Sequence, residues 1–222
     1  MIFRHYAVIA VLLVIAPYAS RAQWGVEAGV GYDIQGGTFT APCACPYSDG
    51  SGYAVRGAVS YDVISLFGLS IGVMPGVDYK QFESAHTWTN PNDPSFSIRD
   101  SANISQTYIT FEPYVRYTIP VVGVFVQAAP SAAYMVSSHF YQRKYNATID
   151  SVWQNGPLEN SANMRYSAHI SAGYDFALLG LQVAPSITAD LPLSQIYSVD
   201  AKNVASSYWG ITTIYGSLAV RF

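Results

Sequence analysis

Residues 24–33 read WGVEAGVGYD, and apolar and polar positions alternate strictly along this stretch. The even positions carry Trp, Val, Ala, Val and Tyr, whereas the odd positions carry Gly, Glu, Gly, Gly and Asp. Successive side chains of an extended strand point to opposite faces of a sheet. The alternation therefore predicts a β-strand with one apolar face and one polar face.

Seven further stretches alternate in the same way, and they cover residues 53–62, 69–80, 109–117, 124–134, 165–176, 181–190 and 208–222. No Asp, Glu, Lys or Arg occupies an apolar position in any of these stretches. The charged residues share the opposite positions with His169, and they are Glu27, Arg56, Asp62, Asp78, Lys80, Glu112, Arg116, Arg165, Asp175, Asp190 and Arg221. We predict an all-β protein of eight antiparallel strands.

The composition narrows the class of protein. Half of the 222 residues are hydrophobic and 11% are charged, whereas a soluble domain has about 25% charged residues. This composition excludes a disordered chain. The formal net charge of −3 means that basic residues are not in excess, so the chain lacks the positive charge that attracts nucleic acid. Eighteen Tyr and 17 Gly favour strands and tight turns.

The N-terminal segment is predicted to be a secretory signal peptide covering residues 1–22. It has Arg4 near its start, an apolar core at residues 7–16, and small residues around a cleavage site after Ala22. Ten apolar residues are too few for a membrane-spanning helix, which needs about 20. Residues 23–222 then form the predicted β-barrel domain.

The predicted connections alternate in length. Residues 34–52, 81–104, 137–163 and 192–206 form long polar connections, whereas residues 62–67, 118–123 and 177–180 form short ones. Long external loops and short periplasmic turns are typical of outer-membrane barrels. We therefore predict an eight-stranded up-and-down transmembrane β-barrel, which is closed because lipid cannot satisfy a free strand edge.

Aromatic residues stand at the ends of the predicted apolar faces. Outer-membrane barrels carry aromatic girdles at both membrane interfaces. The interface aromatics expected here are Trp24, Tyr32, Tyr53, Tyr61, Tyr79, Tyr117, Tyr134, Tyr166, Tyr208 and Phe222. A soluble lipocalin-like barrel also alternates, but its apolar side faces inward. The girdles favour the inverted arrangement, in which the apolar side faces lipid and the charges face the interior.

Several short motifs resemble the outer-membrane β-barrel domain of Bacteroidota, the PorT-like group. They are Glu112-Pro113, Gln127-Ala128-Ala129-Pro130, Ser171-Ala172-Gly173-Tyr174-Asp175-Phe176 and the terminal residues 217–222. The family often has Gly where this chain has Ala129. The resemblance implies localisation in the outer membrane and a role in surface interaction, envelope assembly or secretion, with envelope or secretion partners. The terminal Phe222 looks like the signal that the barrel-assembly machinery reads.

The interior of an eight-stranded barrel is just wide enough for side chains to fill it. Six acidic and five basic residues at the polar positions are nearly balanced, as buried charges must be. We therefore expect a plugged barrel with a structural or interaction role. A narrow channel for small solutes is the first alternative.

The second alternative is a lipid A-modifying enzyme that uses His169 and Ser171. A His-x-Ser pair with an acid can carry out nucleophilic catalysis on acyl esters. Both residues, however, lie at interior positions near the middle of a predicted strand, where a lipid acyl chain would not reach. We therefore predict no enzymatic activity and interpret His169 as a partner of an interior acid.

Cys43 and Cys45 lie in the first external loop. A disulfide across one intervening residue is strained, so a disulfide, a bond to another molecule and a redox role stay open. No metal site, cofactor or nucleic-acid partner is predicted. Aromatic residues in the external loops are either binding anchors or part of the barrel rim, and they are Trp88, Phe140, Tyr141 and Trp153.

Four prolines lie within predicted strands, at positions 75, 113, 130 and 185. Each removes one backbone donor from the ladder, and proline in a sheet is usually confined to edges or bulges. We therefore expect bulges or kinks near these residues.

Overall fold

The computed structural model describes residues 23–37, 39–40, 46–47, 50–90, 92–146, 148, 150–158, 161–194 and 209–222. The signal segment 1–22, Cys43, Cys45 and Tyr208 lie outside the described residues. The strands are β1 (Trp24–Gly37), β2 (Phe39–Thr40), β3 (Pro46–Tyr47), β4 (Gly50–Leu66), β5 (Leu69–Asn90), β6 (Asp93–Thr118), β7 (Val124–Tyr145), β8 (Asp150–Gly156), β9 (Met164–Tyr174), β10 (Phe176–Leu178), β11 (Leu181–Pro192) and β12 (Trp209–Arg221). In the described part of the chain, no helix has the length and apolar character needed to cross a membrane.

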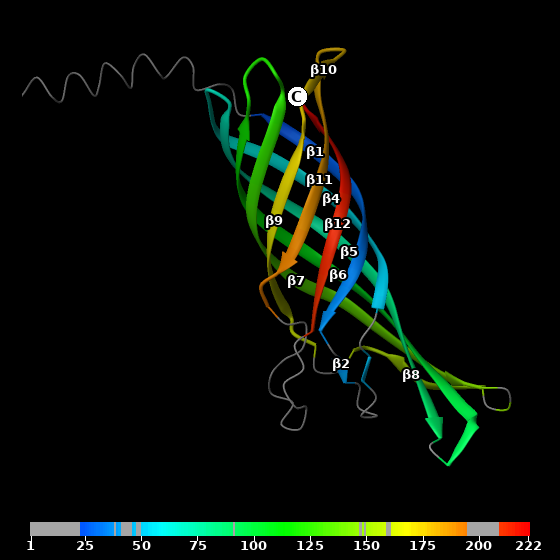
Figure 1. The fold of residues 1–222 in the computed structure, drawn as a ribbon. Coiled ribbons are helices and arrows are strands. Elements are labelled where there is room, and N and C mark those ends of the chain that lie inside the picture. The colour runs from blue at the N-terminus through cyan, green and yellow to red at the C-terminus, as the bar shows by residue number, and fades with distance from the viewer. Residues whose placement is uncertain are drawn as a thin grey trace, which may run out of the picture.

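Eight of these strands form a closed antiparallel ring in the order β1, β4, β5, β6, β7, β9, β11 and β12 (Figure 1). The ring closes because β1 pairs with β4 on one side and with β12 on the other. Val26 lies opposite Val59 in β4 and opposite Val220 in β12. The predicted eight-stranded up-and-down barrel is therefore confirmed.

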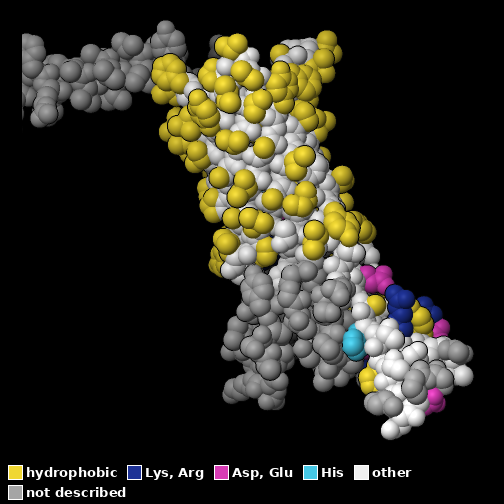
Figure 2. Space-filling view, in the orientation of Figure 1, with side chains coloured by type: hydrophobic (Ala, Val, Ile, Leu, Met, Phe, Trp, Pro, Cys, Tyr) yellow, Lys and Arg dark blue, Asp and Glu magenta, His cyan; other side chains and the backbone are white. Residues whose placement is uncertain are grey.

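The apolar face of each strand points outward. Val30 is 68% exposed and Ile187 is 66% exposed, whereas Asp33, Glu112 and Asp190 are fully buried. Figure 2 shows hydrophobic side chains over the barrel wall on the side in view. This arrangement is the inverse of a soluble barrel, because the apolar surface needs lipid as its solvent.

Two of the three short turns are tighter than predicted, whereas the turn predicted at residues 118–123 agrees with the connection at residues 119–123. β4 continues through Leu66, so the predicted turn at residues 62–67 is wrong, and the connection consists of Phe67 and Gly68 alone. Both of these residues have positive φ, at 50° and 84°. Leu179 and Gly180 repeat the arrangement between β10 and β11. Two central residues with positive φ match the twist of the strands that they join.

Two of the predicted long loops are largely β-sheet. β5 continues to Asn90 and β6 begins at Asp93, where a loop was expected at residues 81–104. β7 likewise continues to Tyr145 and pairs with β8, where a loop was expected at residues 137–163. Outward positions turn polar here while the strands continue, because this part of the sheet faces water instead of lipid. We call the described residues of 81–104 and 137–156 the extension, which leans away from the barrel in Figure 1.

The other two long connections are only partly described. β1 continues to Gly37 and β4 begins at Gly50, so both strands reach into the predicted loop at residues 34–52. Within that segment β2 and β3 form a short separate ladder. β11 ends at Pro192, and residues 195–208 lie outside the described chain.

The expected bulges at the prolines are not found. The register shifts of the barrel lie between Asp62 and Ile64, Thr89 and Asn90, Thr107 and Tyr108, and Gln142 and Arg143. Between β6 and β7 the ladder stops at Phe111 and resumes at Val115 in the same register. Pro113 and Pro130 share that gap. Because proline has no backbone N–H, β6 and β7 are not paired around Pro113 and Pro130, and the same register continues on both sides of the gap.

Candidate functional site in the barrel interior

The interior charges form three layers along the barrel axis, ordered by their distance from the short periplasmic turns. The periplasmic layer contains Asp62, Arg116, Asp175 and Arg221. The middle layer contains Glu27, Arg56 and Glu112. The outer layer contains Asp33, Asp78, Lys80, Arg165 and Asp190. Alternation places each of these side chains inside, and strand register decides which of them meet.

Lys80 lies at the centre of the outer layer. Its Nζ lies 2.9 Å from Oδ2 of Asp190 and 3.7 Å from a carboxylate oxygen of both Asp33 and Asp78. Arg165 donates a second hydrogen bond to Oδ2 of Asp190 at 2.5 Å. Three carboxylates thus surround two cations, and each charge has an opposite partner, which a buried ion requires.

Neutral side chains complete the outer layer. The Tyr215 hydroxyl donates to Oδ1 of Asp78 at 2.7 Å, and Thr213 donates to Oδ1 of Asp33 at 2.5 Å. Lys80 donates to the Thr213 hydroxyl. These contacts join residues far apart in the sequence, so the layer couples β1, β5 and β12 within the barrel.

Arg56 and Glu112 are the principal pair of the middle layer. Nη2 of Arg56 donates to Oε2 of Glu112 at 2.6 Å, and Nε of Arg56 lies 3.9 Å from Glu27. His169 connects this layer with the outer one. Its Nδ1 lies 3.0 Å from Oε2 of Glu112 and its Nε2 lies 3.1 Å from Oδ1 of Asp190. A continuous chain of ionisable groups therefore fills the barrel between two layers.

The periplasmic layer is looser than the other two. Arg116 donates to Asp175, which also accepts from Thr118 at 3.1 Å. The Tyr114 hydroxyl donates to Asp62. Nη1 of Arg221 lies 3.8 Å from Oδ2 of Asp62, which is too long for a hydrogen bond.

The structure places all the predicted interior residues inside the barrel, and it adds Asp33. Asp33 occupies a polar position of the first stretch, as Glu27 does. The alternation alone was therefore sufficient to predict that Asp33 faces the interior. With Asp33, the three layers contain seven carboxylates, five cationic side chains and His169. The inward tyrosines 108 and 215 were also missed, because Tyr occurs on either face of a strand, whereas Tyr114 shares the polar positions of its stretch with Glu112 and Arg116.

The His169 and Ser171 pair does not assemble as a nucleophile and base. The Ser171 hydroxyl is hydrogen-bonded to Thr188 at 2.8 Å. The His169 ring instead contacts Arg56, Glu112, Asp190 and Ser167. Both side chains are buried inside the barrel. The geometry supports the interpretation of His169 as a partner of interior acids.

The outer end of the interior combines apolar side chains with the buried polar residues Asp100, Gln106 and Gln142. Phe82, Ile104, Phe140 and Ile211 are each 1–2% exposed and lie beyond the outer charge layer along their strands. Phe140, which was expected in an external loop, therefore belongs to the core of the extension. Trp88 is exposed there and lies 6.4 Å from the ring of Phe96.

The predicted interface aromatics that the structure describes form two bands on the outer wall. Trp24 lies opposite Tyr61 near the periplasmic end, and their ring centroids are 4.7 Å apart. Tyr32 lies opposite Tyr53 near the external end, where the rings of Tyr53 and Tyr79 are 6.2 Å apart. The remaining members are Tyr117, Tyr134, Tyr166 and Phe222, all of them exposed. The described residues contain no cluster of His, Cys, Asp and Glu suited to a metal ion.

A closed barrel with a lipid-facing apolar wall and an ionised interior defines an outer-membrane β-barrel protein. The chain belongs to the family described as the outer membrane protein β-barrel domain, whose model matches residues 16–198. The localisation in the outer membrane follows from this membership. A comparison with curated proteins finds no match.

Several solved outer-membrane barrels are similar to this chain at low identity. Neisserial surface protein A is 12% identical with a TM-score of 0.36, and 89% of this chain and 95% of that chain are covered. The attachment invasion locus protein Ail of Yersinia pestis is 10% identical with a TM-score of 0.38, covering 91% and 100%. The N-terminal barrel domain of Pseudomonas aeruginosa OprF is 11% identical with a TM-score of 0.29, covering 91% and 100%. Similarity at this level says nothing about what the chain binds.

Proposed function

We propose that this outer-membrane protein is a plugged, non-enzymatic barrel that presents an interaction surface outside the cell. The observation that carries the proposal is the filled interior. Three charge layers and the buried side chains at the outer end occupy the space that a pore would need, and Glu112, Asp190 and Lys80 are each at most 1% exposed. An eight-stranded barrel has little interior volume beyond its side chains.

The extension supplies the interaction surface. Among the described residues, every exposed charged residue lies in it, and they are Glu83, Asp93, Arg99, Arg143 and Asp150. Figure 2 shows charged side chains gathered on the extension, beside a barrel wall that shows none in this view. Trp88 and Val152 add exposed apolar area. A sheet outside the lipid that exposes both apolar and charged side chains is suited to contact with another protein, because interfaces combine an apolar core with a polar rim.

The finer parts of the proposal rest on the sequence. The protein is a PorT-like member from Bacteroidota whose signal peptide is removed after Ala22. Phe222 takes part in recognition by the barrel-assembly machinery. The partners of the extension are envelope or secretion proteins, and the role is adhesion, envelope assembly or secretion support.

Planar-bilayer recording tests the plugged interior. The purified barrel is expected to show no steady conductance, and a stable conductance step would establish the narrow channel instead. Lipid A from cells that overexpress the protein is expected to keep its mass spectrum. A new lipid A species that depends on His169 would establish the enzyme.

Site-specific photo-crosslinking in intact cells tests the interaction surface. A photoreactive residue at position 88 or 152 of the extension is expected to give a discrete protein adduct. The matched control is position 30, which faces lipid and is expected to give none. Adducts from neither extension position, in a protein that is folded in the outer membrane, would overturn the surface role.

A further inference from the structure

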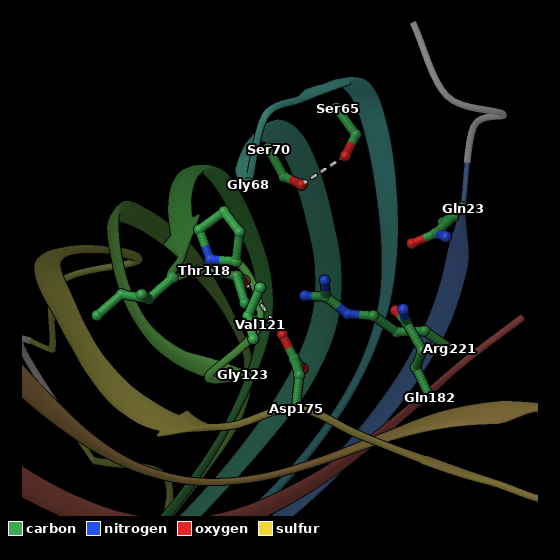
Figure 3. Close-up of a pocket in the computed structure, with 12 residues that line it drawn as sticks. Gln23, Ser65, Gly68, Ser70, Thr118, Val121, Gly123, Asp175, Gln182 and Arg221 are labelled. Atoms are coloured by element: carbon green, nitrogen blue, oxygen red, sulfur yellow. Dashed lines mark hydrogen bonds between the residues drawn. The ribbon is translucent and has the colours of Figure 1, made fainter. Parts of the chain in front are cut away.

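A polar pocket opens at the periplasmic end of the barrel (Figure 3). Its volume is about 330 Å³, and its walls include Ser65, Ser70, Thr118, Asp175, Gln182 and Arg221 together with the turn at residues 119–123. We call it the mouth pocket. It lies at the opposite end of the barrel from the extension, so its role is separate from the proposed surface interaction.

Arg221 differs from the other interior cations. Arg56, Lys80, Arg116 and Arg165 each donate a hydrogen bond to a carboxylate. Arg221 is 7% exposed and, within the described residues, donates no hydrogen bond to a carboxylate; its Nε has no partner, as is also true of Nε in Arg56 and Arg165. Its nearest carboxylate is Asp62, at 3.8 Å. A nearly buried guanidinium that has no carboxylate at hydrogen-bond distance is suited to accept an anion as its partner.

The other groups of the mouth pocket do not supply that acceptor. Both oxygens of Asp175 are engaged, because Oδ1 accepts from Arg116 and Oδ2 accepts from Thr118. Ser70 donates to Ser65 at 3.2 Å, which leaves the Ser65 hydroxyl proton free to donate in turn. Figure 3 shows the Arg221 side chain reaching into the mouth toward the Thr118 side of the pocket. The pocket therefore presents donors that lack an acceptor.

We propose that the mouth pocket binds a small oxyanion from the periplasm, a carboxylate or a phosphate group, with Arg221 as its principal ligand. The planar guanidinium fork matches both anions through paired N–H donors. The volume lies at the lower end of the range for ligand pockets, which is about 300–1,000 Å³. The pocket thus accommodates a small solute or the charged end of a larger one.

NMR titration of the ¹⁵N-labelled barrel in nanodiscs tests this site, with inorganic phosphate and acetate as separate probes. At constant ionic strength, saturable shifts are expected for the Nε–H signal of Arg221 and the backbone N–H of Gly123. Phosphate shifts alone would identify a phosphate ligand, and acetate shifts alone a carboxylate. Shifts with neither probe, or only the linear drift that chloride also produces, would overturn the proposal.

Two variants keep the test decisive. Arg221→Gln is expected to weaken binding at least tenfold, whereas Arg143→Gln in the extension should leave it unchanged. Gln182→Glu provides a variant that retains Arg221, because residue 182 lies opposite Arg221 in the ladder and is exposed. The new carboxylate would form an ion pair with the Arg221 guanidinium and would therefore also weaken anion binding at least tenfold. Wild-type affinity in a folded Gln182→Glu barrel would contradict the site.

Discussion

Single residues in the interior depend on partners from distant strands. Arg56 of β4 meets Glu112 of β6 and His169 of β9, so each charge is neutralised only in the closed barrel. Such pairs contribute little net stability over apolar residues of the same shape, but the loss of one partner is costly. Their value here is to fill a polar interior with groups that satisfy one another.

Glu112→Gln tests this dependence. The substitution leaves Arg56 buried beside a neutral amide, and we expect a loss of about 3–5 kcal/mol in the free energy of unfolding, as for other broken buried pairs. Urea unfolding in lipid vesicles measures it. Glu83→Gln in the extension is the exposed control and should change the free energy by well under about 1 kcal/mol. Equal effects of the two substitutions would contradict the role of the interior pair.

Each long strand passes through two environments. Along β7 the outward positions are apolar up to Tyr134 and Val136, and polar residues follow from Ser137 onward. The inward positions are buried in the barrel, as at Gln127, and again in the extension, as at Phe140, whereas Met135 and Ser138 between them are half-buried. The outward residues therefore mark the lipid boundary, and the pairing of β6 with β7 shifts its register there, between Thr107 and Tyr108, before it continues into the extension.

A charge on the lipid-facing side of a strand locates that boundary. Ile170 lies midway between Tyr166 and Tyr174 on the outer face of β9 and is exposed. We expect Ile170→Arg to destabilise the barrel by about 2–4 kcal/mol, as for Arg at the bilayer midplane. Val152→Arg on β8 provides the control, because Val152 faces water. Vesicle unfolding should separate the two, and equal costs would place residue 170 outside the hydrocarbon.

The hairpin of β7 and β8 carries an ion pair in water. Arg143 donates two hydrogen bonds to Asp150, at 2.6 and 2.8 Å. This bonding holds the pKa of the Asp150 carboxyl below its ordinary value. The pair therefore stabilises the hairpin at pH values above the unfolded-state pKa of Asp, about 3.9, and this contribution is lost as the pH falls through the lowered pKa.

An NMR titration of the Asp150 carboxyl carbon measures that shift. The midpoint is expected below the ordinary Asp value in the wild type and close to it in Arg143→Gln. Since both side chains are exposed, salt should reduce the difference between the two proteins. Identical midpoints at low salt would show that the hydrogen bonds do not persist in solution.

The whole molecule is held together by ring closure. β12 pairs with β1 and with β11, so it satisfies the backbone groups of two strands that would otherwise meet lipid. An unsatisfied backbone group in hydrocarbon costs several kcal/mol. The closed ring also encloses the charge layers, because their members come from both sides of the β1–β12 pairing.

Truncation after Gly216 tests closure. It removes the ladder partners of residues 25–29 in β1 and of residues 182–186 in β11. We expect the truncated chain to lose heat-modifiable migration on a gel. The control replaces residues 86–100 of the extension with Asn-Gly, which joins Ala85 to its ladder partner Ser101 and leaves the barrel intact. Heat-modifiable migration of the truncated chain would show that closure is dispensable.

The alternation of apolar and polar residues predicted the barrel strands because it can be read within a single strand. The neighbours Val26 and Glu27, for example, already show which face is apolar. The sequence predicts loops where β5–β8 continue beyond the membrane. The outward residues become polar there, and polar residues without alternation are typical of loops. The bulges expected at Pro113 and Pro130 were also wrong. The two prolines share one gap in the ladder, which single-strand reasoning does not reveal.

The alternation of residues along the chain specifies the strands, the face that contacts lipid and the charges that lie inside, because each of these follows from the parity of neighbouring positions. Which charges contact one another depends on how the folded strands pair. Asp33 reaches Lys80, and His169 joins Glu112 to Asp190, through the stagger between strands. Arg221 was left without a close partner for the same reason. Register is a property of strand pairs, and no single strand encodes it.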